Sequence, residues 1–476
     1  MHLQLTESKR ILRSILKFSQ LKKIKLYIVG GFIRDIILGR SRKNPDIDFA
    51  VARNAIRFAA GLAKQLKSGF VVLDKKNGCA RLVKKKEGTV YTLDFTDFRG
   101  RDLLDDLAKR DFSINSLAVE LGPFLKNSNS GLIDPYEGLK DIKSRIIRMV
   151  GLRAFDDDPL RILRTFSLSC MLDFKIAPKT LALARRKKNK LRRVSFERIR
   201  DELFKILSSP NGYNFLAQLD SYGVLEIIIP EIKPMKRLKQ GPYHHLDVWK
   251  HTLETMRHLE RIFRSFNRNK DIRDYLGQEF PSGHGRRELI RMGAFMHDIG
   301  KPKALRIEKG KLKFYGHEHI GARMLSEVTR RLKLSNNESY ILKRMVTLHL
   351  RPGYLADNAA LTQRARFRFF RDAGEEAISV LLISLADQRA TKGFLTTEES
   401  RRRHERLIRR LIKEYFKNKT EKKIPRLING HDLIKKFKLA PSPLIGKILA
   451  EIEELQAIGK IKTKQQAFSS AKKLIT

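Results

Sequence analysis

The feature that most constrains this chain is the stretch 46–51, Asp-Ile-Asp-Phe-Ala-Val, which has the alternation of a β-strand. A period of two puts the apolar side chains on one face of such a strand and Asp46 and Asp48 on the other. Two neighbouring carboxylates repel each other unless a divalent cation joins them, and hard oxygen ligands suit Mg²⁺. The stretch therefore predicts either a magnesium site or a solvated acidic edge.

A glycine turn lies just upstream of the two aspartates. Residues 26–29 are an apolar run of β character, Gly30 and Gly31 supply a turn without Cβ atoms, and residues 32–38 have helical spacing. The unpaired N–H groups at a helix start favour an anion, and Arg34 adds positive charge in the first turn. A plain tight turn is the alternative, but with the aspartates the pattern predicts a triphosphate beside Mg²⁺.

This order of strand, glycine turn, helix and Asp-x-Asp strand resembles the head domain of the class II tRNA nucleotidyltransferase and bacterial poly(A) polymerase family. Residues 109–115, Lys-Arg-Asp-Phe-Ser-Ile-Asn, are similar to the family motif Arg-Arg-Asp-Phe-x-x-Asn, with lysine in place of the first arginine. The resemblance implies that this motif binds the sugar and phosphates of an incoming nucleotide through Arg110, Asp111 and Asn115. An amphipathic helix over 105–120 with an exposed Arg-Asp pair is the alternative. By analogy, Asp94 is a third acid beside the aspartate pair.

Residues 157–164, Asp-Asp-Pro-Leu-Arg-Ile-Leu-Arg, begin a helix. One interpretation is structural: Asp158 is the N-cap, Pro159 occupies N1, and Asp157 makes a surface pair with Arg161. The stretch also resembles the family motif Glu-Asp-x-x-Arg, in which side chains select the base by its donors and acceptors. The resemblance implies that nucleotide selection, for C or A, rests on Asp158, Arg161 and Arg164. Residues 197–202, Glu-Arg-Ile-Arg-Asp-Glu, resemble the structural neck motif of the family.

The connection between Phe98 and Arg110 is short. Family members that add the terminal adenosine have a longer flexible loop at this place, and a short loop is typical of relatives that add only two cytidines. Addition of CCA and addition of CC alone therefore both remain open.

A second set of candidate ligands follows residue 240. Any one of these histidines is better explained as a surface or core residue. Together with two aspartates, however, they follow the order His, His-Asp, His, His, Asp. Imidazoles with carboxylates favour a transition metal, Mn, Ni, Fe or Zn, over Mg²⁺. The order resembles the HD superfamily of metal-dependent phosphohydrolases and implies the ligands His251, His297, Asp298, His317, His349 and Asp387. A helical body that only binds tRNA is the alternative.

The charge of the chain indicates a polyanionic partner. Its 476 residues include 99 Lys and Arg against 52 Asp and Glu, a formal net charge of +47. Counterion release from RNA would supply salt-dependent affinity. No apolar run could span a membrane, and the N-terminus lacks a signal-peptide core, so we expect a cytoplasmic protein with no membrane partner. Cys79 and Cys170 are far apart in sequence, which predicts two buried thiols.

These observations predict an α+β protein. A nucleotidyltransferase (polymerase β-like) head with a small mixed sheet would occupy residues 1–150, helical neck and RNA-binding segments 151–235, an HD domain 236–400, and a basic linker and tRNA-binding tail 401–476. The resemblance implies template-independent addition of CCA, or CC only, to the 3′ end of tRNA from CTP and ATP with Mg²⁺, and a phosphohydrolase activity of the HD domain. The alternatives are a poly(A) polymerase, an HD phosphohydrolase acting on RNA ends with a vestigial head, and a non-catalytic RNA-binding protein.

Overall fold

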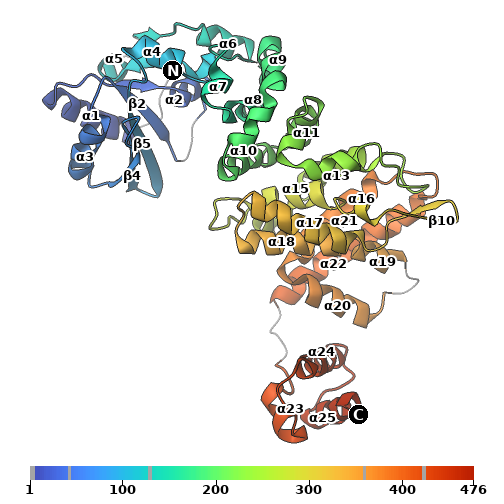
Figure 1. Ribbon diagram of the computed structural model, residues 1–476. Coiled ribbons are helices and arrows are strands. Elements are labelled where there is room, and N and C mark those ends of the chain that lie inside the picture. The colour runs from blue at the N-terminus through green and yellow to red at the C-terminus, as the bar shows by residue number, and fades with distance from the viewer. Residues whose placement is uncertain (1–5, 41–43, 127–130, 358–360, 421–424, 476) are drawn as a thin grey trace. The chain divides into compact units, whose positions relative to one another are not determined.

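The chain forms two compact units, drawn in Figure 1. The computed structural model describes residues 6–40, 44–126, 131–357, 361–420 and 425–475. The first unit comprises Met1–Ile206 and Gln218–Ile228, and the second comprises Leu207–Ala217 and Ile229–Thr476.

A seven-stranded mixed sheet is the centre of the first unit. Its order is β3-β4-β5-β2-β1-β6-β7, in which β2 and β5 are parallel and all other neighbours are antiparallel. The predicted α+β head with a mixed sheet is confirmed. The strands are β1 (Tyr27–Val29), β2 (Asp46–Val51), β3 (Gly69–Asp74), β4 (Cys79–Lys86), β5 (Thr89–Asp97), β6 (Ala118–Glu120) and β7 (Leu132–Ile133).

Helices surround the sheet and continue beyond it into the neck. The α-helices are α1 (Thr6–Leu21), α2 (Gly31–Ile37), α3 (Ala55–Leu66), α4 (Leu103–Ala108), α5 (Leu121–Lys126), α6 (Gly138–Ser144), α7 (Ala154–Asp157), α8 (Leu160–Leu172), α9 (Pro178–Lys187), α10 (Phe196–Ser208), α11 (Gly212–Ser221) and α12 (Leu225–Ile228). Two 3₁₀ turns, η1 (Ser113–Asn115) and η2 (Lys188–Arg193), and a small parallel pair, β8 (Ile146–Ile147) with β9 (Lys175–Ile176), complete this part.

The apolar face of β2 is the core of the head. Ile47 and Val51 are fully buried, and Phe49 stacks on Phe95 of β5 with ring centroids 4.7 Å apart. Phe58 of α3 contacts the same Phe95 ring at 5.4 Å. Burial of such side chains contributes roughly 1.5–3 kcal/mol each. The core face is thereby fixed, and the two aspartates of β2 lie on the opposite face, as the alternation predicts.

The structure differs from the sequence-based interpretations at three points. Strand β4 was not predicted, because its sequence is polar and only Ala80 and Leu82 enter the core. The stretch 105–120 is no continuous helix, since α4 ends at Ala108 and η1 and β6 follow. Neither cysteine is in a disulfide; Cys170 is buried as predicted, whereas Cys79 is only half-buried.

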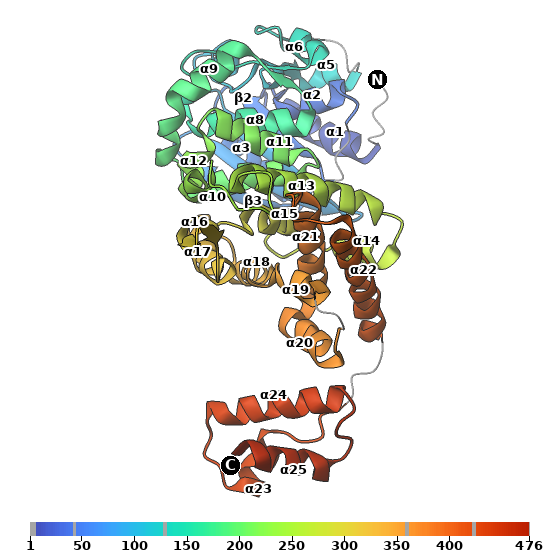
Figure 2. The ribbon, with the colours of Figure 1, turned by 90° about the vertical axis from the view of Figure 1, so that its right-hand side faces the viewer.

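The second unit is largely helical. Helix α21 is buried along almost its whole length and packs against α13, α15, α18 and α22 (Figure 2). The helices are α13 (Val248–Ser265), α14 (Lys270–Leu276), α15 (Arg286–Met296), α16 (Lys301–Ala304), α17 (His317–Arg331), α18 (Asn336–Leu348), α19 (Arg351–Asp357), α20 (Gln363–Ala373), α21 (Ala377–Ala390), α22 (Glu398–Thr420), α23 (Gly430–Phe437), α24 (Pro443–Ala457) and α25 (Lys464–Ile475). Two 3₁₀ turns, η3 (Pro230–Met235) and η4 (Gly374–Glu376), and a hairpin, β10 (Arg306–Glu308) with β11 (Lys311–Lys313), complete it. In the described part of the chain, no helix combines the length and apolarity needed to cross a membrane.

The start of α18 supports a test of stability. Ser335 and Glu338 form a capping box, and the Glu338 carboxylate also accepts hydrogen bonds from Ser282 at 2.8 Å and from His284 at 2.5 Å. Burial opposes ionisation of Glu338, but these partners lower its pKa to about 2 from the ordinary 4.5. The stabilisation is therefore complete above pH 4.5 and lost as the pH falls toward 2. We expect Glu338→Gln to cost roughly 1–3 kcal/mol at pH 7 and almost nothing near pH 2.

Urea unfolding at both pH values measures this difference. Glu327→Gln, at an exposed position of α17, is the control and should change stability at neither pH. An equal cost of Glu338→Gln at both pH values would contradict the assignment.

Candidate active site and metal centres

Three carboxylates meet on the polar face of the head sheet. Oxygen atoms of Asp46, Asp48 and Asp94 all lie within 4.8 Å of one another. Asp48 and Asp94 are paired across the parallel strands β2 and β5, which brings the two side chains to one face. Burial raises the pKa of Asp48 to about 6; Arg110 opposes this rise and the carboxylates of Asp46 and Asp94 add to it. A divalent cation would relieve the repulsion, so the donor set fits Mg²⁺.

The glycine turn fits closely against this cluster. Gly30 has φ +79°, a conformation that L side chains rarely adopt. A Cβ at Gly30 would lie 3.0 Å from the Arg110 guanidinium and 3.3 Å from the Asp48 carboxylate. Gly31, where α2 begins, would place a Cβ 3.2 Å from the guanidinium of Arg34. Both glycines therefore let the backbone approach the acidic and basic groups of the site.

The predicted phosphate and sugar ligands form one hydrogen-bond network. Arg34 donates to Asn115 at 2.5 Å and to Asp35 at 2.6 and 2.9 Å, and Asn115 donates to Asp111 at 3.0 Å. Arg164 donates to Asp111 at 3.3 Å. Burial disfavours ionisation of Asp111, but Arg164 and the amide of Asn115 hold its pKa below the usual value. These side chains are thus oriented before any ligand binds.

The three residues expected to select the base, Asp158, Arg161 and Arg164, have different hydrogen-bond partners. Arg164 donates to Glu202 of the neck motif at 3.1 Å, so Glu202 orients it. Arg161 is buried and donates to the carbonyl oxygens of Lys109 at 2.8 Å, Arg110 at 3.3 Å and Ala154 at 3.2 Å.

The structural interpretation of Asp158 needs correction. The expected Asp157–Arg161 surface pair is wrong, because Arg161 is buried against those carbonyl oxygens. Asp158 precedes the capping residue Pro159 of α8, although its side chain accepts a hydrogen bond from the N–H of Leu160 at 3.2 Å. The Asp158 carboxylate accepts from Arg198 at 2.8 Å.

A pocket of about 720 Å³ collects almost the whole predicted head site. Asp158 is not among the described residues that line it. Arg40, Arg99 and Lys205 add positive charge that was not predicted from the sequence. Among them only Arg99 had a signal, as a basic residue two positions after the strand β5. The predicted residues in the lining are Gly30, Gly31, Arg34, Asp46, Asp48, Arg110, Asp111, Asn115, Arg161 and Arg164.

The connection beside this pocket is short and held in place. Between Asp97 at the end of β5 and Leu103 at the start of α4 lie only residues 98–102. Arg99 donates to Asp106 at 2.8 Å through its side chain, and Arg101 donates to Asp105 at 3.0 Å through its backbone. A Cβ at Gly100 would lie 2.3 Å from the Cβ of Asp105. The connection therefore has neither the length nor the freedom of a long loop.

Six predicted ligands of the second unit come together in two adjoining groups. His251, His297 and Asp387 form one group, and Asp298, His317 and His349 form the other. The groups touch, since His297 Nε2 and His251 Nε2 of the first lie 3.1 Å and 3.8 Å from Asp298 Oδ2 of the second. Within the second group, His317 Nε2 lies 3.3 Å from Asp298 Oδ1. His251 Nε2 lies 2.8 Å from Asp387 Oδ1. The side chains come from five different parts of the helical body.

A hydrogen bond to the backbone orients three of these imidazoles. His297, His317 and His349 each place Nδ1 within 2.7–2.8 Å of the carbonyl oxygen three residues earlier. Because a carbonyl only accepts, Nδ1 carries the proton and Nε2 keeps a lone pair. These three Nε2 atoms are buried without a hydrogen-bond partner in the described structure. Such donors fit one or two transition-metal ions.

Electrostatics favours the ligating forms of His349 and Asp298. Burial disfavours the charged form of His297, but Asp298 and Asp387 outweigh this effect, so the pKa of His297 is raised. Burial, with His297 and His317 nearby, lowers the pKa of His349 to about 3, so its imidazole is neutral. Burial disfavours the charged form of Asp298, but His297 and Lys301 hold its pKa well below the ordinary value. Lys301 Nζ lies 2.7 Å from Asp298 and donates to Gln240 at 2.6 Å. Lys301 was not predicted from the sequence, although its position three residues after Asp298 was a signal.

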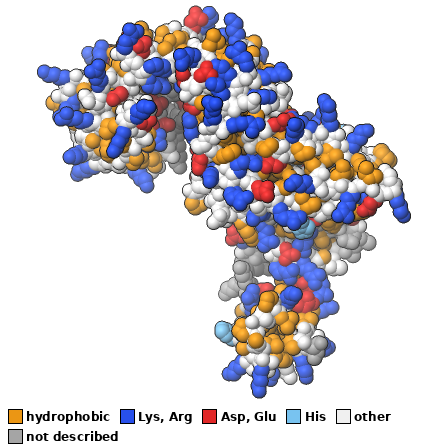
Figure 3. Space-filling model, viewed as in Figure 1, with side chains coloured by type: hydrophobic (Ala, Val, Ile, Leu, Met, Phe, Trp, Pro, Cys, Tyr) orange, Lys and Arg blue, Asp and Glu red, His pale blue; other side chains and the backbone are white. Residues whose placement is uncertain are grey.

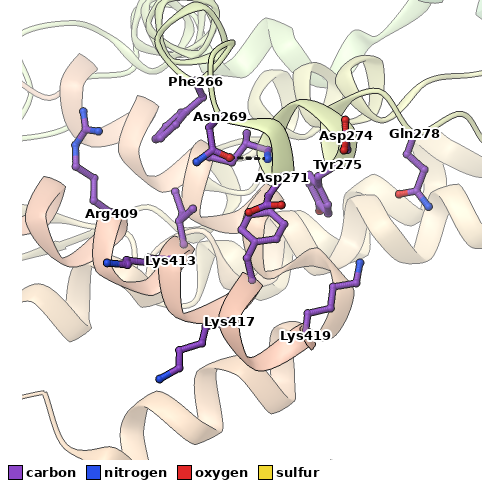
Figure 4. A pocket seen from close by; sticks show the side chains of 13 residues that line it. Phe266, Asn269, Asp271, Asp274, Tyr275, Gln278, Arg409, Lys413, Lys417 and Lys419 are labelled. Atoms are coloured by element: carbon purple, nitrogen blue, oxygen red, sulfur yellow. Dashed lines mark hydrogen bonds between the residues drawn. The ribbon is translucent and has the colours of Figure 1, made fainter. Parts of the chain in front are cut away.

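The second unit has a further pocket, of about 870 Å³, between α14 and α22 (Figure 4). Phe266 and Phe416 contribute apolar surface, and Arg409 lies over the Phe266 ring at 5.6 Å. The lining includes Lys and Arg side chains of α22 as well as Asp271 and Asp274 of α14, so it does not favour one sign of ligand charge. In Figure 3 the Lys and Arg side chains are likewise spread over the visible face.

Comparison with known families matches three consecutive parts of the chain. The poly(A) polymerase head domain matches residues 26–148, the "Probable RNA and SrmB- binding site of polymerase A" matches residues 173–236, and the HD domain matches residues 248–392. Together with the acidic cluster and the glycine turn, they define a nucleotidyltransferase with an RNA-binding segment and an HD domain.

Whole-length relatives identify the family. The chain is 30% identical to the A-adding tRNA nucleotidyltransferase of Deinococcus radiodurans, over 92% of this chain and 93% of the relative. It is 29% identical to the CC-adding tRNA nucleotidyltransferase of Geobacter sulfurreducens, over 93% and 90% of the two chains. The protein belongs to the class II tRNA nucleotidyltransferase and poly(A) polymerase family.

Solved structures share the fold. The CCA-adding enzyme of Thermotoga maritima in complex with tRNA has a TM-score of 0.60 at 23% identity and covers 98% of this chain and 95% of its own. A CCA-adding enzyme in complex with CTP has a TM-score of 0.63 at 24% identity, over 98% and 95% of the two chains.

A pair of neighbouring histidines tests the metal centre of the second unit. His317 has its Nε2 in the cluster, whereas His319, two residues further along α17, is exposed. We expect His317→Ala to weaken Mn²⁺ or Zn²⁺ binding about tenfold or more, because it removes one directed donor. His319→Ala should leave binding unchanged. Metal titration by calorimetry distinguishes the two, and equal effects of both substitutions would contradict this site.

Proposed function

We propose that this protein adds cytidine nucleotides to the 3′ end of tRNA without a template, taking them from CTP. The observation that carries the proposal is the pocket of the head, in which Asp46 and Asp48 lie beside Arg34, Arg110, Arg161 and Arg164. Asp94 adjoins the two aspartates as the third carboxylate of the cluster. A nucleoside triphosphate needs both groups, since a metal ion holds its reacting phosphates and guanidinium groups bind the remaining charge. The assignment of residues 1–150, 151–235, 236–400 and 401–476 to head, neck, HD body and tail belongs to the same proposal.

In this reaction the terminal hydroxyl of the RNA attacks the α-phosphorus of the nucleotide, and pyrophosphate leaves. Asp46, Asp48 and Asp94 would hold Mg²⁺. When bound, this ion would lower the pKa of the attacking hydroxyl and offset charge on the leaving group. Arg110, beside the Gly30 turn, would bind phosphate oxygens. The network of Arg34, Asn115 and Asp111 would orient the sugar and thus align the reacting atoms.

Selection of the base is assigned to Arg161, Arg164 and Asp158. Arg164 lines the pocket and is oriented by Glu202 and Asp111, which supports a direct role. To contact a base, the Arg161 guanidinium would have to release the backbone carbonyl oxygens to which it donates. The Asp158 carboxylate would likewise have to release Arg198. Nucleotide binding would therefore couple selection to a rearrangement at the start of α8.

The short, fixed connection 98–102 supports addition of two cytidines over addition of CCA. The family resemblance implies a longer flexible loop at this place in relatives that add adenosine. Here Arg99 and Arg101 are instead held by hydrogen bonds to Asp106 and Asp105. ATP would then play no part in the final product. Relatives of both kinds match the chain at similar identity, so the loop is the distinguishing feature.

A second activity is proposed for the HD body. The converging Nε2 atoms of His297, His317 and His349 favour a transition-metal centre that acts on a phosphoester, such as a cyclic or terminal phosphate on RNA. A bound metal would supply an activated water. Lys301, next to Asp298, would bring positive charge toward a phosphate.

Substitution of the head aspartates tests the first proposal. We expect Asp48→Asn to slow extension of a tRNA lacking its CCA end by about 10³-fold, because loss of a metal ligand removes several kcal/mol of stabilisation in the transition state. Glu87→Gln, at an exposed turn between β4 and β5, is the control. Extension undiminished by Asp48→Asn would refute the head site. If the head were vestigial, phosphate release from RNA ends would be the sole activity, retained with Asp46→Ala and lost with Asp298→Ala.

Separate nucleotides test the specificity. With CTP alone we expect two cytidines on a tRNA that lacks CCA, and with ATP we expect no addition to a tRNA that ends in CC. Sequencing of the products measures both. Addition of adenosine to the CC end would assign CCA or A addition instead, and a long adenosine tail would assign poly(A) polymerase activity.

A further inference from the structure

Arg81 makes a two-point contact with the third carboxylate of the head. It lies on β4, directly opposite Asp94 of the neighbouring antiparallel strand β5. Its Nε donates to Asp94 Oδ1 at 2.8 Å and its Nη2 donates to Asp94 Oδ2 at 2.7 Å. Such a bidentate pair fixes the plane of a carboxylate as well as its position.

The register of three strands places this contact next to the metal cluster. Asp94 pairs with Arg81 on one side and with Asp48 on the other, so the three side chains form a row across β4, β5 and β2. Paired residues on neighbouring strands project from the same face. The guanidinium therefore reaches Asp94 from the side away from Asp48.

The contact leaves Asp94 able to bind a cation. Each carboxylate oxygen has two acceptor positions, and Arg81 occupies one on each oxygen. One Asp94 oxygen still lies within 4.8 Å of oxygens of Asp46 and Asp48. The side chain of Asp94 is 13% exposed and that of Arg81 is 40% exposed, so the pair is shielded on the carboxylate side. Arg110, a nearby guanidinium, donates to Asp106.

We propose that Arg81 is a positioning residue of the head metal centre, which holds the Asp94 carboxylate turned toward Asp46 and Asp48. This inference rests on the proposed function of the same site and names the group that sets the geometry of its third acid. Arg81 is not among the described residues that line the head pocket. Its effect reaches the cation through Asp94.

Metal binding by the full-length chain tests this role without any need for activity. The probe is Mn²⁺, followed by electron paramagnetic resonance, and the head site is the component of binding that Asp48→Asn removes. We expect Arg81→Ala to weaken this component about tenfold and Arg81→Lys to recover part of the loss, because lysine keeps the charge and loses the two-point geometry. Lys85→Ala, at an exposed position of the same strand, should change nothing.

A double-substitution cycle separates positioning from general structural damage. If Arg81 acts through Asp94, Arg81→Ala should have no further effect on Mn²⁺ binding in a chain that already carries Asp94→Ala. An equal loss in both backgrounds would overturn the proposal, since Arg81 would then act by another route. Tighter Mn²⁺ binding by Arg81→Ala would also overturn it, because the guanidinium would then compete with the cation for Asp94.

Activity gives an independent readout. In extension of tRNA by CTP, Arg81→Ala should raise the Mg²⁺ concentration for half-maximal rate about tenfold and change the rate at saturating Mg²⁺ much less. A fall in the saturating rate with an unchanged Mg²⁺ dependence would contradict a positioning role. If the wild-type chain extends no tRNA, the proposed function fails, and the Mn²⁺ cycle still decides the role of Arg81.

Discussion

The parallel pairing of β2 with β5 is the constraint on which the head depends. On one face of these strands Phe49 stacks on Phe95, and on the other face Asp48 lies beside Asp94. A slip of one residue would turn the acids into the core and the rings into solvent. The aromatic contact therefore fixes the register that brings three like charges together, and packing energy offsets their repulsion.

In the second unit, helices bring the candidate metal ligands together. His297 and His349 each follow the last residue of a helix, His317 begins one, and each ring bonds through Nδ1 to a carbonyl oxygen of the preceding turn. The backbone thereby sets the tautomer and direction of each imidazole. Buried α21 brings Asp387 to the same place, so the ligand geometry follows from the packing of the helical body.

The sequence predicted the features whose signals are local. Alternation in 46–51 indicated the acidic face, and the glycine turn and the ordered histidines indicated their sites. The missed features depend on pairing between distant residues. Strand β4 is polar and is defined by its neighbours β3 and β5, so the contact of Arg81 with Asp94 requires a register that the sequence does not show. Likewise the partners of Asp158 and Arg161 are Arg198 and the carbonyl of Lys109, separated from them by 40 and 52 residues.

The division of the chain into its two units has a consequence for any attempt to separate them. The backbone passes from one unit to the other three times, because Leu207–Ala217 belongs to the second and Gln218–Ile228 to the first. Val224, Leu225 and Ile228 are fully buried. A single proteolytic cut or gene truncation anywhere in this region would deprive one unit of its own buried residues.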